Sequence, residues 1–292
     1  MLFSVVHRTA YRYASAVSLS HHTAHLRPLD LPYQTCRSHQ LAISPLPTSI
    51  EEDRDYFGNG VAAFNITQPH RELVVEATSE VEIFGRDRPD YLLDRAWKDV
   101  AIEAAAARSP GALHAAEFLF PSPSVDITES VAEFARISFI PGRSILDAVL
   151  DLNHRIFDEF TFDSQATTLT TAPAEVLTLK RGVCQDFAHL AIACCRALGV
   201  PALYISGYLE TQPPRGQPRL VGADASHAWL SVYGGDGDWV DIDPTNDILA
   251  GIGHIALATG RDYRDVSPLR GIIIGGGEHD MDVGVDVERL LI

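Results

Sequence analysis

Short apolar stretches, rich in β-branched and aromatic residues, alternate with polar turns through the first ninety residues. Proline and glycine clusters at Pro45–Pro47 and Gly58–Gly60 separate these stretches. Runs of this length, bounded by turn residues, are typical of antiparallel strands. They predict an N-terminal antiparallel, β-sandwich-like domain over residues 1–90. The expected strands are Phe3–His7, Gln40–Ile43, Val61–Ile66 and Leu73–Phe84.

After residue 90 the apolar positions recur every three or four residues, which is the period of a helix. An alanine-rich helix is expected over Tyr91–Arg108, and a second one over Ser144–Phe160. Ser144 is a suitable N-cap for the second helix. A short helix entered through Pro173 is expected at 172–177, because proline is tolerated in the first turn.

One more helix is expected before the pattern changes again. A helical face runs from Cys184 to Leu198, and Gly199 and Pro201 are typical of a helix end. Beyond it the period becomes two, which predicts a helix packed on antiparallel strands. We therefore expect an α+β fold, with residues 91–292 forming the core and its C-terminal strands. The strands expected after the helix are 202–209, 227–233, 239–243, 269–274 and 281–287.

Composition narrows the classes of function. The chain has 292 residues, enough for a substantial core, and a formal net charge of −16. Such an acidic protein repels a phosphate backbone, so a nucleic-acid partner is not expected. The N-terminus lacks the apolar run of a signal peptide, and no stretch reaches the roughly 18 apolar residues of a membrane span. With four cysteines, two of them adjacent, reduced thiols in the cytoplasm fit better than a disulfide scaffold.

Cys184 differs from the other cysteines because it lies at a predicted helix start. Unpaired backbone N–H groups and the positive end of the helix dipole gather there, and their field favours thiolate over thiol. The same N–H groups can stabilise an oxyanion. Cys194 and Cys195 fall in the last turns of the same helix, where a packing role is expected. The local sequence leaves open whether Cys184 is a nucleophile or an inert first residue.

A cysteine nucleophile needs a base, and the base needs an orienting group. His227 opens a predicted strand, and a short loop joins that strand to the next one, which carries Asp241 and Asp243. Such a hairpin could place either acid beside the histidine. From the residues alone, Asp241 and Asp243 are equal candidates for the group that orients His227. Each of these three residues could also be an ordinary polar residue without a catalytic role.

Three segments together resemble the core of the transglutaminase-like superfamily. They are Gly182–Ala188, Ser226–Trp229 and Trp239–Asn246. The resemblance implies a papain-like α+β core in which Cys184 is the nucleophile, His227 the base and Asp243, the acid before Pro-Thr, the orienting group. It implies no metal or organic cofactor. The calcium dependence and oxyanion tryptophan of the animal enzymes have no identifiable counterpart here.

Three flanking segments extend the resemblance to bacterial members that carry an extra N-terminal β domain. They are His7–Tyr13, Asp55–Asn59 and Gly260–Val266. The expected activity is thiol-dependent acyl transfer on a peptide or protein amide, with hydrolysis favoured over transglutamination. A binding or scaffold protein with a vestigial triad is the alternative of another class. No membrane partner is expected, and edge strands of the β domain would allow a homo-oligomer.

Overall fold

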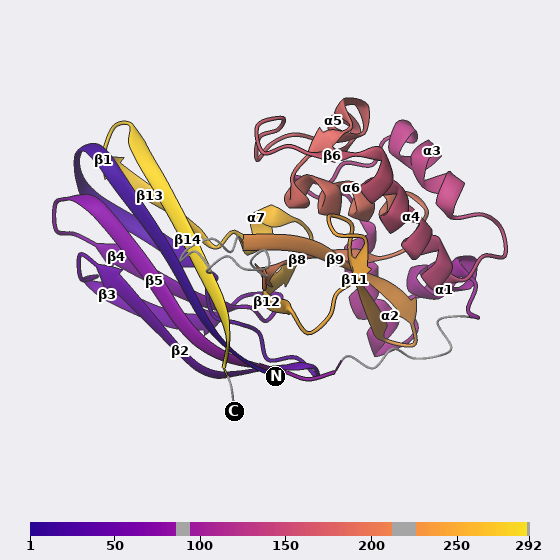
Figure 1. Cartoon of the computed structure of the whole chain (residues 1–292), viewed down its shortest axis with the longest axis horizontal. Helices are drawn as coiled ribbons and strands as arrows, with labels where there is room; N and C mark the ends of the chain where they lie inside the picture. The colour runs from indigo at the N-terminus through magenta and orange to yellow at the C-terminus, as the bar shows by residue number, and fades with distance from the viewer. Residues whose placement is uncertain (86–93, 212–225, 291–292) are drawn as a thin grey trace, which may run out of the picture.

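The computed structural model describes residues 1–85, 94–211 and 226–290. Figure 1 shows two parts: a curved antiparallel sheet, and a mixed core of helices and strands beside it. The α+β class and the antiparallel N-terminal strands agree with the sequence prediction. The N-terminal strands form one curled sheet, and apolar side chains of residues 60–66 and 70–83 meet in one buried cluster, in agreement with the predicted sandwich-like arrangement.

The N-terminal sheet is built around one long strand, β1 (Leu2–Ala24). The first half of β1 pairs with β5 (His70–Ile83), and the second half pairs with β4 (Gly60–Ile66). β2 (Gln34–Ser44) and β3 (Ser49–Arg54) complete the order β2-β5-β1-β4-β3. Because alternate side chains of a strand point to opposite faces, β1 buries every second residue at its start.

The last two strands of the chain join this same sheet. β13 (Leu269–Gly275) and β14 (His279–Leu290) both pair antiparallel with β1. Gly275, Gly276 and Gly277 all have positive φ, and they form the turn between the two strands that the triple glycine predicts. The sequence pattern assigned both strands to the core. In the structure they pair instead with β1, about 245 to 290 residues earlier in the chain. The division of the chain at residue 90 stays a prediction.

The core contains the helices that the 3.6-residue period predicts. Side chains of Ser109, Thr128 and Ser144 accept hydrogen bonds from backbone N–H groups at the starts of α2, α3 and α4. The helices are α1 (Trp97–Ala106), α2 (Pro110–Ala116), the 3₁₀ turn η2 (Glu117–Leu119), α3 (Glu129–Ser138), α4 (Ile145–Glu159), α5 (Pro173–Leu179), α6 (Cys184–Ala197) and α7 (Tyr263–Val266). β6 (Thr161–Phe162) and β7 (Arg181–Gly182) form a short parallel pair.

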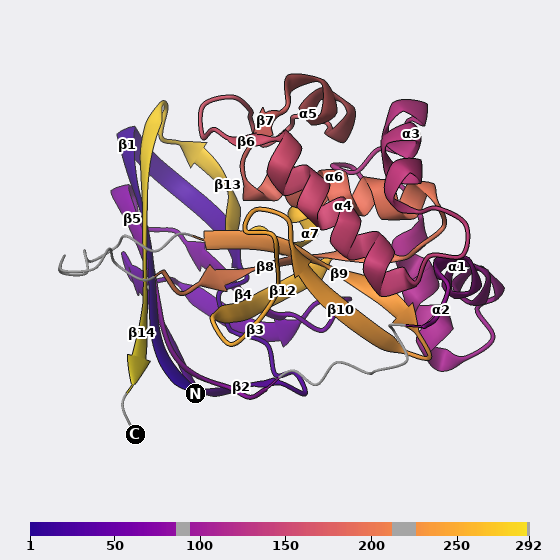
Figure 2. The ribbon, with the colours of Figure 1, turned by 45° about the vertical axis from the view of Figure 1, so that its right-hand side comes forward.

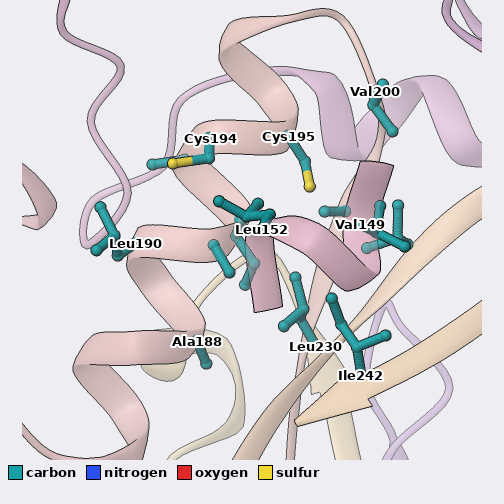
Figure 3. Packing of buried hydrophobic residues seen from close by; sticks show 14 of the residues in the cluster. Val149, Leu152, Ala188, Leu190, Cys194, Cys195, Val200, Leu230 and Ile242 are labelled. Carbon is teal, nitrogen blue, oxygen red and sulfur yellow. The ribbon is translucent and has the colours of Figure 1, made fainter. Parts of the chain in front are cut away.

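A five-stranded antiparallel sheet lies against α6, in the order β11-β10-β9-β8-β12. Its strands are β8 (Ala202–Leu209), β9 (Ser226–Gly235), β10 (Asp238–Asp243), β11 (Ile248–Leu249) and β12 (His254–Gly260). Apolar side chains from α4, α6 and this sheet form one large buried cluster, of which Figure 3 shows a part. Helix α6 is therefore held between helices and sheet along its whole length.

The N-terminal sheet packs on the core through a separate apolar cluster. Phe3 and Val5 of β1 contact Tyr208 of β8 and Ile255 of β12 within it. Figure 2 shows β1 and β14 side by side in the N-terminal sheet, to the left of the core. Two hydrogen bonds between the Asn59 side chain and the Thr259 backbone add a polar link between the parts.

All four cysteines carry free thiols, in accord with the expected reduced state. Within residues 1–85, 94–211 and 226–290, every helix falls short of the length and apolar character that a membrane span requires. The cytoplasmic assignment stays a prediction.

Candidate active site

Cys184 is the first residue of α6, and its side chain is half-buried. The carboxylate of Asp186, two positions along, accepts a hydrogen bond from the Val183 backbone N–H at 2.8 Å. The Thr167 hydroxyl donates to the same carboxylate oxygen at 2.6 Å. A Cβ on Gly182 would lie 2.8 Å from that oxygen, so only glycine allows this close approach. These contacts fix the turn that presents the Cys184 thiol.

His227 lies near the beginning of β9, with 9% of its surface exposed. Its Nε2 is 2.7 Å from Oδ2 of Asp243, which leaves Nδ1 as the nitrogen that can meet Cys184. Burial alone would lower the pKa of His227. Hydrogen bonds with Asp243 and Cys184, and the negative charges of both, raise it to about 9. The imidazole is therefore held in its protonated form at neutral pH, beside the Cys184 sulfur.

Asp243 ends β10 and is fully buried. Its two oxygens accept hydrogen bonds from the Thr245 backbone N–H at 3.0 Å and from the Asn246 amide at 2.7 Å. Burial alone would raise the pKa of Asp243, but the hydrogen bonds from His227 and His254 hold it well below its usual range. Asp243 is thus a carboxylate fixed in place by backbone and side-chain donors.

A second histidine, His254, contacts the same oxygen of Asp243 and was missed by sequence reasoning. Its Nε2 lies 3.1 Å from Oδ2, and its Nδ1 accepts a hydrogen bond from the Gly251 backbone N–H at 3.1 Å. That backbone donor places the ring proton on Nε2, where it points at Asp243. His254 is the first residue of β12, and the sequence around it contains no catalytic motif. Nothing in the sequence therefore distinguished it from the other histidines, of which the chain has twelve in all.

The competing acid, Asp241, is engaged elsewhere. Its Oδ2 accepts a hydrogen bond from the Tyr33 hydroxyl at 3.0 Å. The hairpin of β9 and β10 forms as expected, with Ile242 of β10 opposite Leu230 of β9. The structure therefore brings His227 together with Asp243 and gives Asp241 a partner from the N-terminal part of the chain. The catalytic roles of Cys184, His227 and Asp243 stay a prediction.

His227, Asp243 and His254 have side chains of the kind that bind metals, and their donor atoms lie within 4.8 Å of one another. The two nitrogens lie 2.7 and 3.1 Å from one carboxylate oxygen, which are hydrogen-bond distances. Each histidine can therefore donate a proton to the Asp243 carboxylate. The prediction that the site needs no metal is not tested by this geometry.

Cys194 and Cys195 are fully buried at the other end of α6. In Figure 3 their sulfurs point in different directions, among side chains that include Val149 and Leu152. Burial raises the pKa of Cys195 to about 12 and raises that of Cys194 well above its usual value. Both therefore stay thiols and pack as apolar side chains, as the sequence predicts.

A nucleophile beside an imidazole that a carboxylate orients is an arrangement suited to acyl transfer. Comparison with known proteins supports this interpretation of the geometry. Residues 140–244, which include all three groups, match the family described as the transglutaminase-like superfamily. Residues 3–82 match the bacterial transglutaminase-like N-terminal region. The chain belongs to the transglutaminase-like superfamily.

Of two relatives of this superfamily member, one aligns over nearly the whole chain and the other over less than half of it. An uncharacterized protein of Mycobacterium tuberculosis (strain ATCC 25618 / H37Rv) is 42% identical over 293 residues, covering 98% of this chain and 92% of its own. The protein-glutamine gamma-glutamyltransferase of Pseudomonas aeruginosa is 26% identical over 121 residues, covering 41% of this chain and 18% of its own.

One solved structure shares the architecture. A protein from Cytophaga hutchinsonii, named a "Putative Cysteine Protease", superposes with a TM-score of 0.80 at 23% identity. The match covers 100% of this chain and 91% of that one, so the N-terminal sheet and the core occur together in both. At this identity the likeness establishes the fold alone.

Proposed function

We propose that this transglutaminase-like protein is an enzyme that transfers acyl groups through a thioester on Cys184. The observation that carries the proposal is the contact of Cys184 with His227, whose other ring nitrogen binds Asp243 at 2.7 Å. Three residues distant in sequence meet in the order that the chemistry requires: nucleophile, base and orienting carboxylate.

In the first step the Cys184 thiolate, paired with the protonated His227, attacks the carbonyl carbon of an amide. The developing oxyanion is met by the backbone N–H of Cys184, one of the groups that a helix start leaves without an internal partner. The protonated His227 donates its proton to the leaving amine, the carbon–nitrogen bond breaks, and a thioester remains. Asp243 holds the ring in place through Nε2 and stabilises its positive charge.

In the second step water attacks the thioester. His227, now neutral, accepts the proton of the water, the carbon–sulfur bond breaks, and a carboxylic acid leaves. An amine that replaced water would give transglutamination by the same route. We favour hydrolysis, with peptide or side-chain amides as substrates, and the likeness to a glutamyltransferase keeps amine transfer as the second candidate.

Mass spectrometry of a glutamine-containing peptide separates these activities. Peptide-bond cleavage gives fragments, side-chain hydrolysis converts glutamine to glutamate, and transglutamination adds the mass of a supplied primary amine less ammonia. We expect hydrolysis products that disappear in Cys184→Ala and persist with excess amine. Amine incorporation that outpaces hydrolysis would instead establish the transferase.

Iodoacetamide labelling tests whether the protein is an enzyme or a binding protein with a vestigial triad. An activated Cys184 should be alkylated at a rate that already has a plateau at neutral pH. A rate that rises only around pH 8.5, as for an ordinary exposed cysteine, would contradict the enzyme hypothesis.

A further inference from the structure

A cavity of about 260 Å³ lies in front of the catalytic groups and has walls from both parts of the molecule. Cys184 and His227 line it, and so do Tyr204 and Ser206 of β8, on the core side. Because these two residues are two apart on one strand, their side chains point to the same face. The cavity is large enough for two or three side chains of a ligand, and it reaches the Cys184 thiol.

The opposite wall comes from the N-terminal sheet. His7, Thr9 and Tyr11, at alternate positions of β1, line it together with Met281 and Val283 of β14. Tyr11 pairs directly with Met281, and Thr9 with Val283, so these side chains form one continuous patch. The same face of β1 that packs Phe3 and Val5 against the core thus becomes the wall of the cavity further along the strand.

Two of the flanking segments that resemble the bacterial family members, His7–Tyr13 and Gly260–Val266, contribute residues to this cavity. The alternation in His7–Tyr13 sends His7, Thr9 and Tyr11 toward it, while Arg8 and Arg12 lie near glutamates of β5. Tyr263, from Gly260–Val266, also lines the cavity, and its backbone N–H donates to His189 at 3.1 Å. These flanking segments therefore build the surroundings of the site.

The described residues that line the cavity include no aspartate, glutamate, lysine or arginine, although the chain has 39 acidic and 23 basic residues. His7 contacts the Tyr208 hydroxyl at 2.9 Å and the Thr9 hydroxyl at 3.0 Å, and burial lowers its pKa to about 4. His7 is therefore neutral at physiological pH. Apart from the thiol and imidazole of the proposed nucleophile and base, nothing in this lining can neutralise a charge on a ligand.

The Tyr204 hydroxyl offers a neutral contact instead. The residue is 2% exposed, and burial, with a smaller contribution from the neighbouring Cys184, raises the pKa of its hydroxyl. Among the described residues its hydroxyl has no hydrogen-bond partner, so it is available to an uncharged polar group in the cavity. A charged group entering the same space would lose its hydration without gaining a counter-ion, which is costly.

We propose that β1 and β14 of the N-terminal sheet form the specificity wall of a composite acyl pocket, which admits an uncharged acyl group and excludes anionic and cationic ones. The proposal rests on the proposed function of Cys184. It names a substrate class that the triad alone does not specify, and it gives the N-terminal sheet a direct part in recognition.

Three 4-nitrophenyl esters test the proposal without choosing between hydrolysis and amine transfer. Their acyl groups are 5,5-dimethylhexanoyl, its isosteric cation 4-(trimethylammonio)butanoyl, and the anion 4-sulfobutanoyl. The Cys184 sulfur bonds to the acyl carbon, the carbon–oxygen bond breaks, and 4-nitrophenolate leaves with the electron pair as a coloured burst. We expect the neutral ester to acylate the protein about tenfold faster or more than either charged ester.

Met281→Arg tests the wall, with Ile274→Arg as its matched control. Both positions are large, apolar and exposed, at 59% and 57%, in consecutive strands that pair with β1, but Ile274 is outside the cavity lining. Met281→Arg should shift the rate ratio of anionic to neutral ester upward by about tenfold, since it supplies the missing counter-ion, while Ile274→Arg leaves that ratio unchanged.

The outcomes are distinguishable. Equal burst rates for the three esters, or equal ratios for the two arginine variants, would overturn the pocket proposal and leave the proposed function standing. If the native protein released no burst of 4-nitrophenolate, or if the burst persisted in Cys184→Ala, the proposed function would be overturned, and the pocket proposal with it.

Discussion

Helix α6 has cysteines at both ends, and their surroundings differ in every respect that matters for reactivity. At its start, Cys184 is half-buried, lines a cavity and contacts a histidine with a raised pKa. At its far end, Cys194 and Cys195 are fully buried among apolar side chains, and burial raises the pKa of both thiols. One residue type is thus suited to chemistry or to packing according to water access and neighbouring charge.

Removal of each thiol gives the sharpest test of this difference. Cys184→Ala should reduce kcat/KM by on the order of 10⁴-fold or more, because no other group can form the thioester. Cys195→Ala should leave kcat/KM unchanged and lower the free energy of unfolding by about 1 kcal/mol, the usual cost of one buried atom. Amide hydrolysis and urea denaturation of both variants measure these effects. Loss of activity in Cys195→Ala, with Cys184→Ala active, would reverse the comparison.

Asp243→Asn tests whether the reactivity of Cys184, at the start of α6, depends on the ion pair of His227 with Asp243. The pKa of His227, about 9, lies above its ordinary 6.5, so the ring is protonated below pH 9 and loses its proton as pH rises through 9. Without the carboxylate, burial dominates and the pKa of His227 falls. We expect a 10³–10⁴-fold lower kcat/KM, on the order seen when an orienting acid is removed.

The pH dependence makes this second test specific. In the native protein, the fall of kcat/KM at high pH should centre near pH 9, where His227 can no longer protonate the leaving amine. The folding stability that comes from this shift should be complete below pH 6.5 and lost through pH 9. Asp243→Asn should move the fall in kcat/KM to lower pH. An unchanged profile would show that another group controls it.

His254→Phe should have the smallest effect. It removes one of several hydrogen bonds to Asp243, so we expect kcat/KM to fall by about tenfold and the high-pH limb to move by less than in Asp243→Asn. His22→Phe is the matched control: His22 is also buried, stacks on Phe64 in the N-terminal sheet, and makes no hydrogen bond to a described residue. Equal profiles for the two variants would remove His254 from the site.

Local pattern predicts much of this molecule because helices and strands are set by neighbours in sequence. The caps and the 3.6-residue period locate α4 within a residue at either end, and the strand of residues 202–209 matches its prediction. The position of Cys184 at a helix start and the hairpin that carries His227 and Asp243 follow from the same short-range rules. The sequence by itself thus determined the elements and the order of the chemical groups along the chain.

Tertiary structure alone decided which distant elements meet. The pairing of β13 and β14 with β1 joins segments about 270 residues apart, and neither strand carries a local mark of its partner. The addition of His254 to Asp243, the engagement of Asp241 by Tyr33, and the contribution of β1 and β14 to the cavity at Cys184 have the same origin. The period of a strand indicates which of its faces is buried. Which other segment covers that face depends on packing across the whole chain.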